Sequence, residues 1–95
     1  MIPKTIKIAG KPYTVSKTSG TGLLGECKST PLTITYEVNQ ADDQLRDTIL
    51  HECLHAMDYA VRIGLKEKQV HALSAMLILF FKENKKLANW LVDGT

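Results

Sequence analysis

The residues best placed to do chemistry lie in the stretch ILHECLHAM, residues 49–57. Within it, His51, Glu52 and His55 form the pattern H-E-x-x-H. On a helix, histidines four residues apart share a face and can each point one nitrogen at a single metal ion. Imidazole nitrogen is a preferred ligand of zinc, so the pattern favours a Zn²⁺ site.

Glu52 is expected to play a different role from the two histidines. It is turned by about 100° around the helix axis from His51 and does not share the face that points at the metal. It can instead reach a water molecule beside the metal and act as a general base. This is the helical signature of metalloproteases. Because the pattern fixes only three positions, two surface histidines without a shared ion are the competing interpretation.

A catalytic zinc site needs a third protein ligand, and the sequence offers two candidates. If the chain reverses at Gly64, an αα-hairpin brings His71 to the level of His55. Glu67 is the alternative, but in such a hairpin it falls short of the metal by about one turn, roughly 5 Å. His71 is therefore the expected third ligand, with Glu67 as its competitor.

Two polar residues after the motif are candidates for supporting roles. Asp58, three residues after His55, could accept a hydrogen bond from the second ring nitrogen of a ligand histidine. Tyr59, four residues after His55, could stabilise a negatively charged oxygen in a transition state. Packing at the rim of the core is the competing interpretation for Tyr59.

These candidates require a helix over residues 39–64. Asn39 is the expected N-cap, and Gly64 the expected C′ residue. Apolar residues at i, i+4 spacing predict its buried line, which comprises Leu45, Ile49, Cys53, Met57 and Val61. A second helix is expected over 65–84, antiparallel to the first, followed by a tail over 85–95. Its predicted buried residues are Val70, Leu73, Leu77 and Phe80 or Phe81.

Residues 1–38 have the shorter period of β-strands. Alternation of apolar and polar residues predicts strands over 4–9, 12–16, 23–28 and 32–38. Strands followed by helices favour an α+β fold, with a small antiparallel sheet of three to four strands and the helices on one face.

Bulk composition narrows the class of protein. The 95 residues are expected to form one domain, 1–95. A net charge of +2 is too small to indicate a nucleic-acid partner, and no apolar run is long enough for a membrane span. The N-terminus lacks the apolar segment of a secretory signal, which predicts a cytoplasmic protein with Cys27 and Cys53 reduced.

Three stretches carry a resemblance to a known group of proteins. MIPKTIKIAGKPYTV, GLLGE and TILHECLHAMDYAVRIGLKEKQVHALS resemble small phage and prophage-encoded zinc metallopeptidase-like proteins. The likeness extends to about residue 84. That group is similar to minimal gluzincins and, more remotely, to ImmA/IrrE and SprT-like metallopeptidases. The resemblance implies a zincin-like fold and zinc-dependent peptide hydrolysis in a host-cell cytoplasm, with His51 and His55 as ligands and Glu52 as base.

The resemblance is incomplete at the third ligand. Relatives of this kind carry Glu where this chain has His71, whereas Glu67 matches their first acidic position. SprT-like proteins use a His at a similar distance. The resemblance also implies that an edge strand binds an extended substrate by β-addition, and 32–38 is the candidate for that edge.

Three functions are consistent with these features. The first is a zinc metallopeptidase acting on a peptide or protein substrate, either alone or as an oligomer. The second is a zinc-stabilised binding or regulatory module of phage origin without significant catalytic activity. The third is a small interaction protein that binds no metal.

Overall fold

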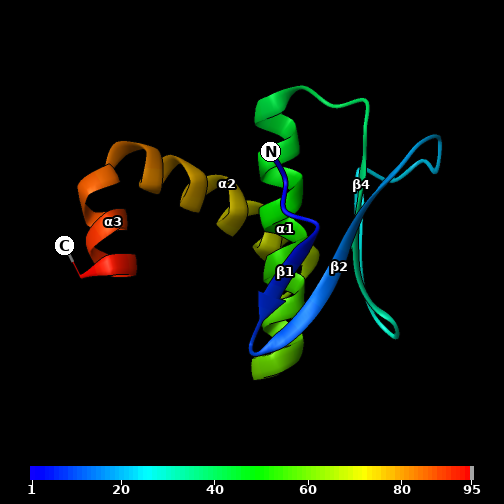
Figure 1. The fold of residues 1–95 in the computed structure, drawn as a ribbon, viewed down its shortest axis with the longest axis horizontal. Helices are drawn as coiled ribbons and strands as arrows, with labels where there is room; N and C mark the ends of the chain where they lie inside the picture. The colour runs from blue at the N-terminus through cyan, green and yellow to red at the C-terminus, as the bar shows by residue number, and fades with distance from the viewer. Residues whose placement is uncertain (95) are drawn as a thin grey trace.

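The computed structural model describes residues 1–94, which form one four-stranded sheet covered on one face by a long helix (Figure 1). The elements are β1 (Thr5–Ile8), β2 (Lys11–Thr18), β3 (Gly25–Ser29), β4 (Leu32–Glu37), α1 (Asp42–Val61), α2 (Glu67–Glu83) and α3 (Lys85–Asp93). The expected α+β class is confirmed. Most of the predicted tail forms α3, and its last residue, Thr95, lies outside the described residues.

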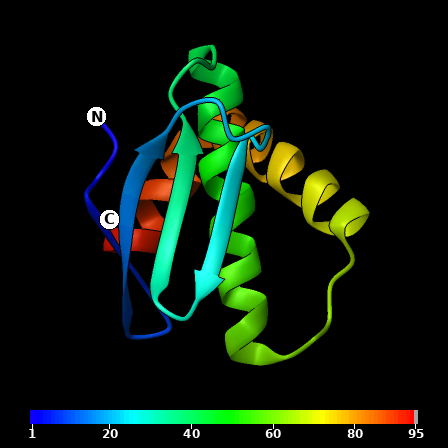
Figure 2. The same cartoon turned by 90° about the vertical axis from the view of Figure 1, so that its right-hand side faces the viewer.

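The sheet is mixed, in the order β1-β2-β4-β3, rather than antiparallel as predicted. β1 pairs with β2 and β3 with β4 as antiparallel neighbours, but β2 and β4 are parallel. The reason is that the β3–β4 hairpin joins the sheet through β4, which places β3 at the outer edge (Figure 2). The prediction that 32–38 forms an edge strand is therefore wrong, since β4 lies inside the sheet and the two edges are β1 and β3.

The core lies between the sheet and α1. Its buried members are Ile8, Tyr13, Val15, Ile34, Cys53 and Ala56. Ile49 packs against them, as predicted, but Met57 and Val61 are 44% and 63% exposed. The predicted apolar line is thus wrong at its C-terminal end, where the side chains of α1 are no longer covered. Among residues 1–94, no helix has the length and apolar character needed to cross a membrane.

The first helix begins three residues later than its predicted N-cap. Asn39 does not cap α1; its backbone N–H donates to a carboxylate oxygen of Glu37 at 3.2 Å. The side-chain amide of Gln40 donates to the backbone carbonyl of Leu24 at 3.0 Å and accepts from the hydroxyl of Thr48 at 2.7 Å. These two residues therefore form the corner between β4 and α1, and the corner is joined to the loop before β3.

The second helix crosses α1 instead of running antiparallel beside it (Figures 1 and 2). Its first half is buried against α1: Val70 and Ser74 are fully buried, and the Ser74 hydroxyl donates to Asp47 at 2.6 Å. The second half reaches α1 through an exposed ion pair of Lys82 with Asp43 at 3.6 Å. Leu73, which is predicted to be buried, is 41% exposed, and so are Phe80 and Phe81, of which one is predicted to be buried. The crossing carries the rest of α2 away from the core, so the periodicity of α2 does not correspond to a covered face.

Candidate metal centre

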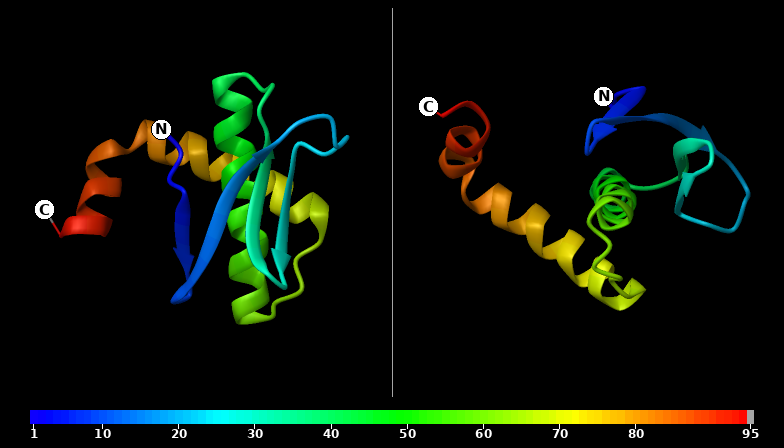
Figure 3. Two further views of the ribbon diagram at one scale, coloured as in Figure 1. Left: turned by 45° about the vertical axis from the view of Figure 1, so that its right-hand side comes forward. Right: turned by 90° about the horizontal axis from the view of Figure 1, so that it is seen from below.

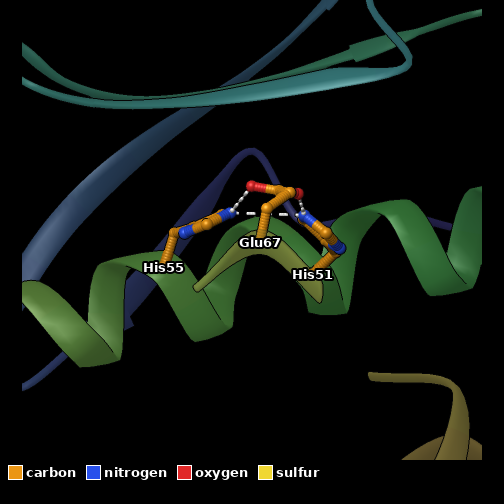
Figure 4. A group of neighbouring side chains, drawn as sticks. All are labelled: His51, His55 and Glu67. Atoms are coloured by element: carbon orange, nitrogen blue, oxygen red, sulfur yellow. Dashed lines mark hydrogen bonds and ion pairs between the residues drawn. The ribbon is translucent and has the colours of Figure 1, made fainter. Parts of the chain in front are cut away.

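Three side chains converge where the start of α2 meets the middle of α1. They are His51 and His55, which point from one face of α1, and Glu67, whose carboxylate lies between the two imidazoles (Figure 4). Glu67 is the first residue of α2. One ligand atom from each side chain lies within 4.8 Å of the others, so the group could hold a metal ion.

The spacing of these atoms suits a tetrahedral cation. The Nε2 atoms of His51 and His55 lie 3.2 Å apart, and His55 Nε2 lies 3.0 Å from Glu67 Oε2. The other carboxylate oxygen, Oε1, contacts His51 Nε2. A tetrahedron with metal–ligand bonds of about 2.0–2.1 Å has an edge of roughly 3.3 Å. The separations of His55 Nε2 from His51 Nε2 and from Glu67 Oε2 are therefore close to the edge of such a tetrahedron.

Glu67, and not His71, joins the two histidines because of the chain between the helices. The prediction of a tight reversal at Gly64 is wrong: residues 62–66 run back along α1 before α2 begins (Figure 2). Five extended residues span at most roughly 17 Å, more than the rise of about 9 Å from His55 to Val61. The linker thus returns the first residue of α2 to the level of the histidines.

His71 lies one helical turn further along and remains close to the site. Its ring centroid is 6.3 Å from that of His51, and it lies outside the group that could hold an ion. The expected order of the two candidates for the third ligand is therefore reversed. His71 instead lines the cleft beside the group.

Asp58 binds the linker between α1 and α2 and forms no hydrogen bond with a histidine ring among the described residues. Its Oδ1 accepts the backbone N–H groups of Ile63 and Gly64 at 3.1 and 2.9 Å, and its Oδ2 accepts that of Leu65 at 2.9 Å. The predicted bond from Asp58 to a ligand histidine is absent from these contacts. The carboxylate therefore acts on the site indirectly, by holding the segment that delivers Glu67.

Replacing Asp58 with alanine is expected to weaken metal binding by about tenfold or more, the scale seen when a group that orients a ligand is lost. The reason is that three backbone donors lose a charged acceptor, and Glu67 loses its fixed position. Zinc affinity is measured by competition with a chromophoric chelator. Asp43→Ala is the control, because Asp43 lies on the same helix and its ion pairs are exposed. Equal affinities of the two variants would contradict this role.

Glu52 lies beside the group, on the side of α1 that faces the sheet. It is 7% exposed. Burial raises the pKa of its carboxyl group, while His51 and His55 partly oppose the rise. It lines a cleft of about 300 Å³ with the two candidate residues His71 and Glu67 and with Gly22–Gly25. A carboxyl group is thus held next to His51 and His55 and at the wall of a cavity, and its role as a general base stays a prediction.

Gly25, the first residue of β3, lets the edge strand approach α1 at this point. A Cβ at Gly25 would lie 2.7 Å from Thr48 Cγ2, 3.1 Å from the carbonyl oxygen of Thr35 and 3.2 Å from Glu52 Cγ. Sequence reasoning missed this residue. The available signal was a glycine inside a strand pattern, which often marks a close backbone approach.

Gly25→Ala is expected to destabilise the fold by about 1–3 kcal/mol, the usual cost of overpacking. Thermal unfolding measures the effect. Gly25→Ala combined with Thr48→Ser should recover part of the loss, since serine lacks the Cγ2 atom but retains the hydroxyl that donates to Gln40. If the double variant is no more stable than Gly25→Ala, the contact with Thr48 is not the cause.

Tyr59 is not brought into the ligand group. It is 49% exposed, and no side-chain hydrogen bond of Tyr59 occurs within residues 1–94. Burial, followed by the charges of Cys27 and Glu52, raises the pKa of its hydroxyl. A role in stabilising an oxyanion stays a prediction.

Comparison of the chain with protein-family models, with curated proteins and with solved structures gives no match. The function must therefore be argued from the site.

Proposed function

We propose that this protein is a minimal zinc-dependent peptidase in which His51, His55 and Glu67 hold the metal and Glu52 is the general base. The observation that carries the proposal is the convergence of two imidazole nitrogens and a carboxylate, within 4.8 Å of one another, beside a buried glutamate. The resemblance of the motif to phage and prophage-encoded metallopeptidase-like proteins supports the same class and a host-cell cytoplasm as the setting.

The donor set favours zinc among the divalent ions. Neutral imidazole suits zinc, and two histidines with one glutamate form a known set of catalytic zinc ligands that leaves a position open. Zinc supplies Lewis acidity, which lowers the pKa of water and polarises a carbonyl oxygen.

The chain itself supplies the proton transfers. Glu52 accepts a proton from the attacking water and donates it to the amine nitrogen of the leaving peptide. Its buried position excludes bulk water from the carboxylate, so its proton stays within the site. Because His51 and His55 lie on the same helix, α1 holds Glu52 at a fixed place relative to the proposed ligands.

We propose that the substrate binds along the edge strand β3. Its outer backbone N–H and C=O groups face away from β4, its only partner in the sheet of residues 1–94. An extended peptide could pair with that edge by β-addition. Because Gly25 of β3 lies against Thr48 and Glu52, the paired peptide would pass beside the base.

A zinc-stabilised binding module without peptidase activity is the second candidate. The observation that favours it is the size of the cleft, about 300 Å³, which is the lower limit for ligand pockets. In addition, the Glu67 side chain is 70% exposed. In a binding module of this kind, the metal would join α2 to α1, and Glu52 would have no substrate.

Metal analysis and a peptide-library assay test both candidates on protein purified without a histidine tag. One zinc per chain, with cleavage that is lost on chelation and restored by zinc, is expected for the peptidase. One zinc per chain without cleavage of any library peptide would favour the binding module. Zinc that stays below stoichiometry after zinc is added would overturn both.

A further inference from the structure

The C-terminal arm, which we define as α2 and α3, leaves a large apolar surface uncovered. Leu73, Met76 and Phe80 of α2 are 41%, 63% and 41% exposed. On α3, Leu87, Trp90 and Leu91 are 37%, 57% and 57% exposed, and no residue of α3 is buried. Their i, i+3, i+4 spacing places the three α3 side chains on one face of the helix.

The same chain carries an apolar groove elsewhere. It has a volume of about 630 Å³ and lies between the N-terminal segment 1–3 and α1, where Leu45, Ile49, Leu50 and Cys53 line it. The chain's own α3 does not fill this groove, because within residues 1–94 α3 packs against α2 alone. The right-hand view in Figure 3 shows α2 leading away from α1, with α3 beyond it.

We propose that two copies of this chain form a two-fold dimer in which α3 of each copy lies in the groove of the other. A two-fold axis covers both apolar surfaces at once, because each copy contributes one α3 helix and one groove. The proposal does not depend on the metal site or on peptidase activity.

The apolar area that this dimer would bury can be compared with the area that a stable interface needs. The exposed parts of Leu87, Trp90 and Leu91 amount to roughly 300 Å², given that large apolar side chains each bury on the order of 200 Å², and a groove that covers them loses about as much. A stable interface removes about 800 Å² from each partner. One α3 and one groove from each copy therefore give roughly 600 Å² per copy, which is the lower end of the range for stable interfaces.

The charges also favour a second copy. Lys85 and Lys86 begin α3, while Asp42 begins α1 at the rim of the groove. Arg46, the other charged residue that lines the groove, is paired with Asp43 at 3.2 Å. Opposite charges at the two edges would orient α3 as it enters. An anionic membrane surface would also attract the lysines, but it would not use the groove.

The test uses the full chain and its single tryptophan, Trp90. Light scattering after gel filtration is expected to give twice the chain mass of 10.6 kDa. On dilution the mass should fall, and the fluorescence of Trp90 should shift to the red as the side chain returns to water. Trp90→Gln should weaken dimerisation at least tenfold, as expected for a central aromatic anchor. Ile63→Gln is the control, since Ile63 is 70% exposed and lies outside the arm.

The groove is tested separately through Leu45→Gln and Leu50→Gln, with circular dichroism to verify folding. Trp90 lies in an element that does not contact α1 in its own chain. Either variant should therefore shift the emission maximum of Trp90 to longer wavelength at a concentration where the parent protein is dimeric. A monomer at every concentration would overturn the proposal, and so would a dimer whose emission neither folded groove variant changes. Blue-shifted emission that is independent of concentration would mean that α3 closes on its own chain.

Discussion

Glu52→Gln is expected to abolish peptide hydrolysis while zinc affinity stays within about threefold of the parent. General-base catalysis contributes about 10²–10⁴-fold to a rate, and glutamine cannot accept the proton. The histidine nitrogens and the Glu67 carboxylate, which form the ligand group, are unchanged by the substitution. The rate of cleavage of the best library peptide is compared with zinc affinity measured by chelator competition.

Stability distinguishes this expected loss of function from unfolding. Glu52 is 7% exposed, and a buried charge is costly to keep, so a neutral amide of the same shape should leave the melting temperature equal or higher. Glu83→Gln is the matched control, because Glu83 is exposed and lies at the last residue of α2, outside both α1 and β3. Parent-like hydrolysis by Glu52→Gln would remove Glu52 from the mechanism.

The parts of the site that lie on one helix could be predicted from the sequence. The i, i+4 relation of His51 and His55 is a property of the helix itself, and the intervening Glu52 is placed by the same geometry. The two hairpins of the sheet are also local, since each joins neighbouring strands through a short turn. Local periodicity and turn residues are sufficient signals for such features.

The predictions that the structure contradicts concern features that depend on contacts between distant segments of the chain. Nothing in the alternation of 11–18 and 32–37 indicates that β2 and β4 are parallel. Likewise, Gly64 was a sound turn signal, but the carboxylate of Asp58 binds the backbone of 63–65 and holds the linker along α1. Asp58, which the sequence places beside the metal, thereby sets where α2 begins. The start of α2 in turn decides whether Glu67 or His71 lies next to His51 and His55.

Glu67→Ala is expected to lower zinc affinity by about 100-fold or more, and His71→Ala by less than about threefold. If Glu67 is the third ligand, its removal leaves the ion with two imidazoles and takes away the charged oxygen ligand. His71 lies outside the ligand group, with its ring centroid 6.3 Å from that of His51. The affinities are measured by competition with a chromophoric chelator at a pH where histidine is neutral.

Two further variants make the comparison decisive. Glu67→Gln keeps the shape of the side chain but not its charge, so an intermediate loss is expected if the carboxylate binds the ion. Glu83→Ala, at the far end of the same helix, controls for loss of a negative charge from α2. If His71→Ala lost affinity while Glu67→Ala did not, the ion would lie further along α2 than the geometry of the linker allows. The extended return of residues 62–66 would then not describe the metal-bound protein.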